Sequence, residues 1–221
     1  MAARVGILGG SFDPIHFGHL RSAEEVREAL ALEHVYFVPA NRPPHKPGRT
    51  LAPAADRLAM VERAIAGNPG FRASAIELER GETSYSVDTL EAFAAALPGA
   101  EVHFIVGIDA FREIDTWKDV ARLFELASFV VTDRPPNVID RSIEQLPVAA
   151  REAFCYDPVT LSYRHRSGTL LQFLPITRID ISATAVRERA RLGESIRYLV
   201  PPEVERYIRD RQLYASGESI G

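Results

Sequence analysis

The feature that most constrains the fold is a glycine-rich turn between an apolar run and a helical pattern, all within the first residues. The apolar run Val5–Leu8 ends at Gly9 and Gly10, and a second turn signal follows at Asp13-Pro14. Glycine lets the backbone approach a ligand closely and adopt φ values that other residues avoid. Backbone N–H groups at the start of the following helix attract anions. The segment therefore predicts a strand, a turn and a helix that together form a phosphate site.

Two histidines stand at the start of the predicted helix. His16 and His19 are three positions apart, which predicts both imidazoles on one face of the helix at its first turn. Imidazole N–H groups there can donate to a phosphate. Ser11 lies nearby, but outside the Gly-x-Ser-x-Gly context of a nucleophilic serine. Two other interpretations stay open: histidines that only cap the helix, and a metal-binding pair, which the lack of a nearby third ligand disfavours.

The rest of the chain alternates short apolar runs with helical patterns. This alternation predicts βαβ units and hence an α/β fold, with a doubly wound, Rossmann-like and mostly parallel sheet covered by helices on both faces. Ligands in such folds bind beyond the carboxyl ends of the strands, where Gly9 and Gly10 fall. The predicted strands are Val5–Leu8, Val35–Pro39, Val102–Val106, Phe129–Thr132 and Leu170–Leu174. The predicted helices contain Leu20 to Leu30, Leu58 to Ile65, Leu90 to Leu97, Leu123 to Leu126, Val186 to Ala190 and Val204 to Leu213.

Length and composition indicate one ordinary globular domain over residues 1–221, with residues 215–221 as a frayed tail. The stretch from Pro135 to Gly168 is expected to be loop, short helix and loop, and we hypothesise an oligomer contact there. No run reaches the ~18 apolar residues of a membrane helix, and the early strand argues against a signal peptide. The single Cys155 is typical of a reducing compartment, so we expect a cytoplasmic protein. The net charge of −4 argues against nucleic-acid binding.

Two polar segments in the first half of the chain carry candidate ligand-binding groups. His45 and Lys46 end a stiff Pro-Pro-His-Lys loop that follows the second predicted strand, which places it on the ligand side of the sheet. The alternative is an ordinary exposed loop. Ser84, Tyr85 and Ser86 precede a helix that we expect to begin near Asp88. Helix capping by their hydroxyl groups is the alternative for this segment.

Three further positions in the second half carry candidate groups. Asp109 follows the third predicted strand after Gly107 and could bind a ribose hydroxyl, or cap a helix. Trp117, the only tryptophan, lies between polar residues, which favours a partly open position over a core one. Arg187 stands near the start of a helix that Ser182 could cap. A cation there opposes the helix dipole, and this placement makes sense where the site holds a polyanion.

The segment from Gly9 to His19 resembles the signature of the His-x-Gly-His nucleotidyltransferases, Gly-Gly-Thr/Ser-Phe-Asp-Pro-x-His-x-Gly-His. The resemblance is greatest to the bacterial nicotinate-nucleotide adenylyltransferases, whose motifs occur here in family order over residues 9–187. Related enzymes that act on phosphopantetheine or choline phosphate share the two ends and lack the middle motifs. This chain departs from the family at Ser86, where the family has Thr, and at Pro136, where it usually has Gly.

The resemblance implies adenylyl transfer from ATP to nicotinate mononucleotide, in NAD biosynthesis, with Mg²⁺ bound mainly through the ATP phosphates. His16, His19 and Arg187 would be catalytic. The implied ATP site comprises Gly9, Gly10, Ser11, Phe12, His16, His19, Gly107, Asp109, Arg134, Ile181, Ser182, Thr184 and Arg187. The implied mononucleotide site comprises Gly10, Ser11, His45, Lys46, Ser84, Tyr85, Ser86, Asp109, Trp117 and Lys118. A preference for nicotinamide mononucleotide, dual specificity and a non-catalytic nucleotide-binding regulator are the alternatives.

Overall fold

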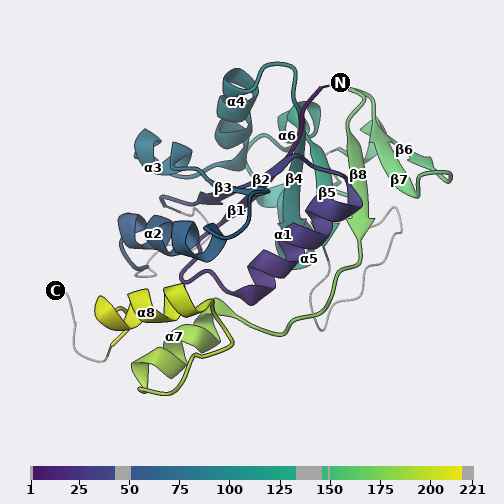
Figure 1. The fold of residues 1–221 in the computed structure, drawn as a ribbon. Coiled ribbons are helices and arrows are strands. Elements are labelled where there is room, and N and C mark those ends of the chain that lie inside the picture. The colour runs from purple at the N-terminus through teal and green to yellow at the C-terminus, as the bar shows by residue number, and fades with distance from the viewer. Residues whose placement is uncertain (1, 43–50, 133–145, 149, 216–221) are drawn as a thin grey trace.

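A sheet of eight strands forms the centre of the protein in the computed structural model, which describes residues 2–42, 51–132, 146–148 and 150–215. The strand order is β3-β2-β1-β4-β5-β8-β7-β6 (Figure 1). The strands from β3 to β8 in this order pair in parallel, whereas β7 is antiparallel to both of its neighbours. The predicted parallel sheet is thus confirmed. Its strands are β1 (Arg4–Gly10), β2 (His34–Pro39), β3 (Phe71–Ala73), β4 (Glu101–Gly107), β5 (Ser128–Thr132), β6 (Phe154–Asp157), β7 (Ser162–His165) and β8 (Leu170–Leu174).

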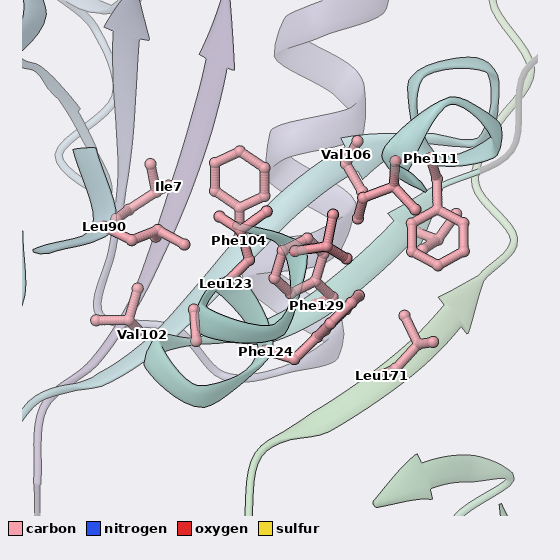
Figure 2. Packing of buried hydrophobic residues seen from close by; sticks show 14 of the residues in the cluster. Ile7, Leu90, Val102, Phe104, Val106, Phe111, Leu123, Phe124, Phe129 and Leu171 are labelled. Atoms are coloured by element: carbon pink, nitrogen blue, oxygen red, sulfur yellow. The ribbon is translucent and has the colours of Figure 1, made fainter. Parts of the chain in front are cut away.

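Helices cover both faces of the sheet because its central strands are apolar on both sides. Successive side chains of a strand point to opposite faces, so Ile7 and Leu8 of β1 enter two different cores. Ile7 packs in the cluster of α4, α5 and α6, part of which Figure 2 shows. Leu8 packs in the cluster of α1, α2, α7 and α8. The helices are α1 (Phe17–Ala29), α2 (Ala54–Ile65), α3 (Ile76–Arg80), α4 (Ser86–Ala96), α5 (Ile108–Arg112), α6 (Val120–Leu126), α7 (Ala183–Arg191) and α8 (Pro202–Asp210).

The structure corrects the prediction of loop, short helix and loop between Pro135 and Gly168. Residues 133–145 and 149 lie outside the described residues, but β6 and β7 form an antiparallel hairpin that extends the sheet beyond β8. Each strand has only four residues, and Cys155 and Tyr156 are exposed. Such short strands with polar positions carry too weak an apolar pattern to be recognised. The three-residue strand β3 was missed for the same reason. The predicted oligomer contact stays a hypothesis.

The chain returns after β8 to the middle of the sheet. Residues 175–182 run below α1 and bring α7 and α8 to the carboxyl end of β1 (Figure 1). The backbone N–H of Thr177 donates to the Glu25 carboxylate of α1 at 2.8 Å and holds this connection. Segments from the first and last parts of the sequence therefore meet at the turn after β1. None of the helices in the described residues is long and apolar enough to cross a membrane.

Candidate active site

A cavity of about 530 Å³ opens at the carboxyl ends of β1 and β4. The sheet order places β2 on one side of β1 and β4 on the other, so the chain winds away from this point in both directions. Five segments line this cavity: the glycine-rich turn, the start of α1, the residues before α4, the end of β4 and the start of α7. The volume lies within the usual range for a small-molecule site. The cavity thus lies where the sequence predicted a ligand site, beyond the carboxyl ends of the strands.

The turn after β1 is built differently from the prediction. Gly9 and Gly10 both belong to β1 and neither has a positive φ, whereas Phe12 adopts a left-handed φ of 46°. Glycine at position 10 leaves room for the buried Phe12 ring, because a Cβ there would lie only 3.1 Å from it. At Gly9 the nearest such contact is with Phe104, at 4.0 Å. The prediction also held that these glycines let the backbone approach a ligand closely. Both positions are consistent with it, since both glycines line the cavity.

The two histidines face the cavity as a stacked pair. Their ring centroids are 3.7 Å apart and the planes are inclined by 29°. His16 has an extended backbone and precedes the first helical residue, so the prediction that both lie within the first turn holds only for His19. The His16 backbone N–H donates to Nδ1 of His19 at 3.2 Å. Because that nitrogen accepts, a neutral His19 carries its proton on Nε2. His19 thus takes part in capping α1, and both histidines also line the cavity.

The start of α7 supplies hydroxyl groups and a cation from the far end of the sequence. Ser182 caps this helix as predicted, with its hydroxyl accepting from the Ala185 backbone N–H at 3.1 Å. Arg187 contacts the turn after β1, where its Nη1 donates to the carbonyl oxygen of Asp13 at 2.6 Å. Its Nη2 donates to the Thr184 hydroxyl at 3.1 Å. This arrangement closes one end of the cavity with the partial positive charge of a helix start and a guanidinium group.

The opposite end of the cavity is formed by the residues before α4 and by Trp117. α4 begins at Ser86, two residues earlier than expected, and no side chain caps it. The Ser84 hydroxyl instead accepts from the Asn41 backbone N–H at 2.8 Å. The half-buried Trp117 ring packs edge-on against Phe104, with centroids 6.2 Å apart, so the expected partly open position is confirmed. Asp109 lies within α5 and not at its cap, where Gly107 stands, and its exposed side chain lines the cavity.

Comparison with known proteins agrees with this geometry. The cytidylyltransferase-like family matches residues 7–189. A relative from Trichlorobacter lovleyi is 49% identical over 96% of this chain and 99% of its own length, and one from Syntrophotalea carbinolica is 48% identical over 97% and 99%. Both carry the name "Probable nicotinate-nucleotide adenylyltransferase". This chain belongs to that family.

The solved structure of nicotinic acid mononucleotide adenylyltransferase from Plasmodium falciparum, complexed with NaAD, shares the fold. Its TM-score is 0.75 at 18% identity, with 96% of this chain and 97% of that one covered. A structure from Vibrio parahaemolyticus gives 0.63 at 15% identity, with 97% of each chain covered. The predicted Rossmann-like nucleotidyltransferase fold is therefore confirmed.

Most of the site residues expected from the family motifs do line the cavity. Two described ones do not: Ile181, and Lys118, which is exposed and pairs with Asp88 at 2.8 Å while lying 4.9 Å above the Tyr85 ring. The predictions for His45, Lys46 and Arg134 fall outside the described residues. The predicted residues gathered in the cavity wall are Gly9, Gly10, Ser11, Phe12, His16, His19, Ser84, Tyr85, Ser86, Gly107, Asp109, Trp117, Ser182, Thr184 and Arg187.

Sequence reasoning missed four charged groups in the wall of this adenylyltransferase cavity: Asp13, Glu77, Glu113 and Arg178. Asp13 was read only as part of a turn, and nothing in the pattern around Arg178 marks it. Glu77 is buried in the five-residue helix α3, which is too short for its acidic position to stand out. Its Oε1 accepts from the Thr89 hydroxyl at 2.6 Å, and burial raises the pKa of the Glu77 carboxyl above its ordinary value.

Proposed function

We propose that the protein transfers the adenylyl group of ATP to nicotinate mononucleotide, forming nicotinate adenine dinucleotide and pyrophosphate. The observation that carries the proposal is the convergence on one cavity, which also holds Trp117, of two helix starts whose donors suit a phosphate. The stacked histidines come from the start of α1, and the Ser182–Arg187 group comes from the start of α7. The names of the relatives, which match along their whole length, support this choice of substrates.

The chemistry that fits this site is a direct displacement. A phosphate oxygen of the mononucleotide attacks the α-phosphorus of ATP in line, and the bond from that phosphorus to the bridging oxygen of the β-phosphate breaks. Pyrophosphate leaves with the electron pair. The attacking oxygen is already negative, so no general base and no covalent intermediate is needed. The protein then contributes positioning and charge stabilisation.

Each end of the cavity has a distinct part in this scheme. The Nε2–H of His19, with His16 stacked against it, donates to the α-phosphate as charge develops there. The start of α7, with Thr184 and Arg187, binds the β- and γ-phosphates. Trp117 stacks on the pyridinium ring, for which an electron-rich indole is suited. Asp109 accepts a hydrogen bond from a ribose hydroxyl.

Magnesium belongs to the nucleotide in this proposal. Among the described residues, no group of three or more His, Cys, Asp or Glu side chains is placed to hold a metal ion. Mg²⁺ readily keeps water ligands and binds through substrate phosphates with few protein groups. We therefore expect it to enter as MgATP and to neutralise the pyrophosphate that leaves.

The decisive experiment is pyrophosphate release with MgATP and either nicotinate or nicotinamide mononucleotide. We expect release with strong preference for the acid. Equal or reversed preference would keep the chemistry and move the protein to the amide substrate; no release with either would refute adenylyl transfer to these acceptors. In the same assay, His19→Ala should lower turnover by orders of magnitude while the circular dichroism spectrum stays unchanged. Near-normal turnover of His19→Ala would contradict the proposed role of this donor.

A further inference from the structure

The Asp13 carboxylate is buried in the cavity wall and is contacted from three distant parts of the chain. Its Oδ1 accepts from the Tyr214 hydroxyl at 2.7 Å and from the Ala52 backbone N–H at 3.2 Å. Its Oδ2 lies 3.5 Å from Nη1 of Arg187, the nitrogen that donates to the Asp13 carbonyl. The residue is only 1% exposed. A carboxylate buried this deeply requires such compensation, because its desolvation is expensive.

A buried cation, Arg57, contacts the same turn. Arg57 is also 1% exposed and donates to the carbonyl oxygens of Ser11 at 2.8 Å, Ala52 at 3.0 Å and Asn41 at 3.3 Å. Burial lowers the pKa of the Arg57 guanidinium, and the nearby charge of Asp13 opposes this effect. Arg57 therefore joins the backbone just before Asp13 to the backbone at Asn41 and Ala52, while the Asp13 side chain depends on Tyr214 and Ala52 for direct hydrogen bonds.

Tyr214 reaches Asp13 through an unusual backbone path. It follows the end of α8 at Asp210, and both Gln212, with φ 52°, and Tyr214, with φ 65°, are left-handed. That conformation is unfavourable for residues with a side chain. Burial and the Asp13 charge raise the pKa of the Tyr214 hydroxyl above its ordinary value, so it stays a donor at neutral pH. The segment after α8, despite its unfavourable φ values, thus places the Tyr214 hydroxyl against the Asp13 carboxylate in the cavity wall.

We propose that Tyr214 is a positioning residue, which holds the Asp13 carboxylate so that Arg187 stays available for the ATP phosphates. The inference rests on the proposed function, since it assigns Arg187 to those phosphates. Asp13 and the polyphosphate compete for the same guanidinium group. With Oδ1 occupied by two donors, Oδ2 stands 3.5 Å from Arg187, longer than the about 2.7–2.9 Å of a strong charge-assisted bond. Without the hydroxyl, Asp13 would draw Arg187 closer and ATP would bind less well.

The chain offers a matched control for this test. Tyr207 on α8 also donates its hydroxyl to a buried carboxylate, Oδ1 of Asp56, at the same distance of 2.7 Å. Neither Tyr207 nor Asp56 lines the cavity. Tyr207→Phe and Tyr214→Phe therefore each remove one hydroxyl that anchors the C-terminal segment. Only Tyr214→Phe changes the group that faces Arg187.

The experiment compares these two variants with wild type in urea unfolding, in pyrophosphate release and in calorimetric binding of a non-hydrolysable ATP analogue. Both variants should lose similar stability. For Tyr214→Phe alone, kcat/KM for ATP and analogue affinity should each fall about tenfold, the lower range for a hydrogen bond to a charged group. The KM for the mononucleotide should stay unchanged. Equal nucleotide affinity of the two variants would overturn the inference.

A double variant tests the route through Arg187. In an Arg187→Lys background, Tyr214→Phe should have little further effect on analogue affinity, because the two residues act as a unit. Fully additive losses would refute that route. The analogue also separates this inference from the proposed function. If wild type binds the analogue but releases no pyrophosphate with either mononucleotide, adenylyl transfer fails, while the ratio of analogue affinities still decides the role of Tyr214.

Discussion

Replacing Gly18 by alanine should separate the activity of this protein from its stability. Gly18 lies in the first turn of α1, between the two histidines, and its backbone is not left-handed. A Cβ there would stand 3.1 Å from both Cε1 and Nδ1 of the His16 ring. Since carbon contacts are optimal at about 3.5–4.0 Å, the ring must move by about 0.4 Å. His16 has little room to yield, because it is 1% exposed and stacks on His19.

Gly18→Ala has two effects on stability, which oppose each other: a gain in helix propensity and a strained contact with His16. Only the strained contact affects catalysis, and it lowers the rate. Alanine in place of glycine favours a helix by about 1 kcal/mol, and this gain offsets much of the strain of the close contact. The shift of the imidazole pair is not offset, since transfer depends on donors placed within a fraction of an ångström. We expect kcat to fall about tenfold, a part of the loss that a displacement of 1 Å can cause. Stability should change by less than about 1 kcal/mol.

The assay is initial-rate pyrophosphate release at saturating substrates, together with urea unfolding of the same preparations. Gly67→Ala is the matched control, because a Cβ at Gly67 would meet nothing within 4 Å and its φ is also not left-handed. It should keep full activity. A turnover number for Gly18→Ala equal to that of wild type would refute the reasoning, as it would show that the position of the His16 ring does not limit catalysis.

Three further predictions follow from single groups. Burial raises the pKa of Glu77 in the folded state, so its charge costs stability as the pH rises above the ordinary glutamate range near about 4.3; in urea unfolding, Glu77→Gln should be more stable than wild type at pH 7.5 and lose this advantage at pH 4. Gly81 ends α3 with φ 73° in open space, and Gly81→Ala should cost about 1 kcal/mol of unfolding free energy without changing turnover. Trp117 is the only tryptophan, so saturating nicotinate mononucleotide should quench the intrinsic fluorescence; unchanged emission would contradict stacking on this ring.

The sheet could be predicted from the sequence where its strands are apolar on both faces. Val5–Leu8 and Phe129–Thr132 lie in the middle of the sheet between two layers of helices, so their runs are continuous and easily recognised. The hairpin of β6 and β7 lies at the edge beyond β8, where short strands need few apolar residues. Its formation depends on pairing with the rest of the sheet, and that pairing leaves no periodic signal in the sequence.

The candidate site could be predicted where residues form a contiguous motif, as from Gly9 to His19 and from Ser182 to Arg187. The details of the backbone could not. The left-handed φ occurs at Phe12, and the two glycines that were predicted to form the turn lie in a strand. Position 10 favours a small residue because the Phe12 ring packs against it, a tertiary contact that the sequence pattern does not reveal. Asp13 and Tyr214 escaped notice because their roles exist only in the contact between them, across 201 positions of sequence.

The path of the chain explains why a phosphate site should depend on the segment that follows α8. β1 lies in the middle of the sheet, so the turn that follows it is reached by helices from both halves of the fold. The second half ends at β8, away from β1, and residues 175–182 must cross back before α7 can begin (Figure 1). That return brings Arg187 to Asp13. A guanidinium beside a buried carboxylate is drawn towards it, and the Tyr214 hydroxyl, which the segment after α8 brings to Asp13, is the donor that limits this competition.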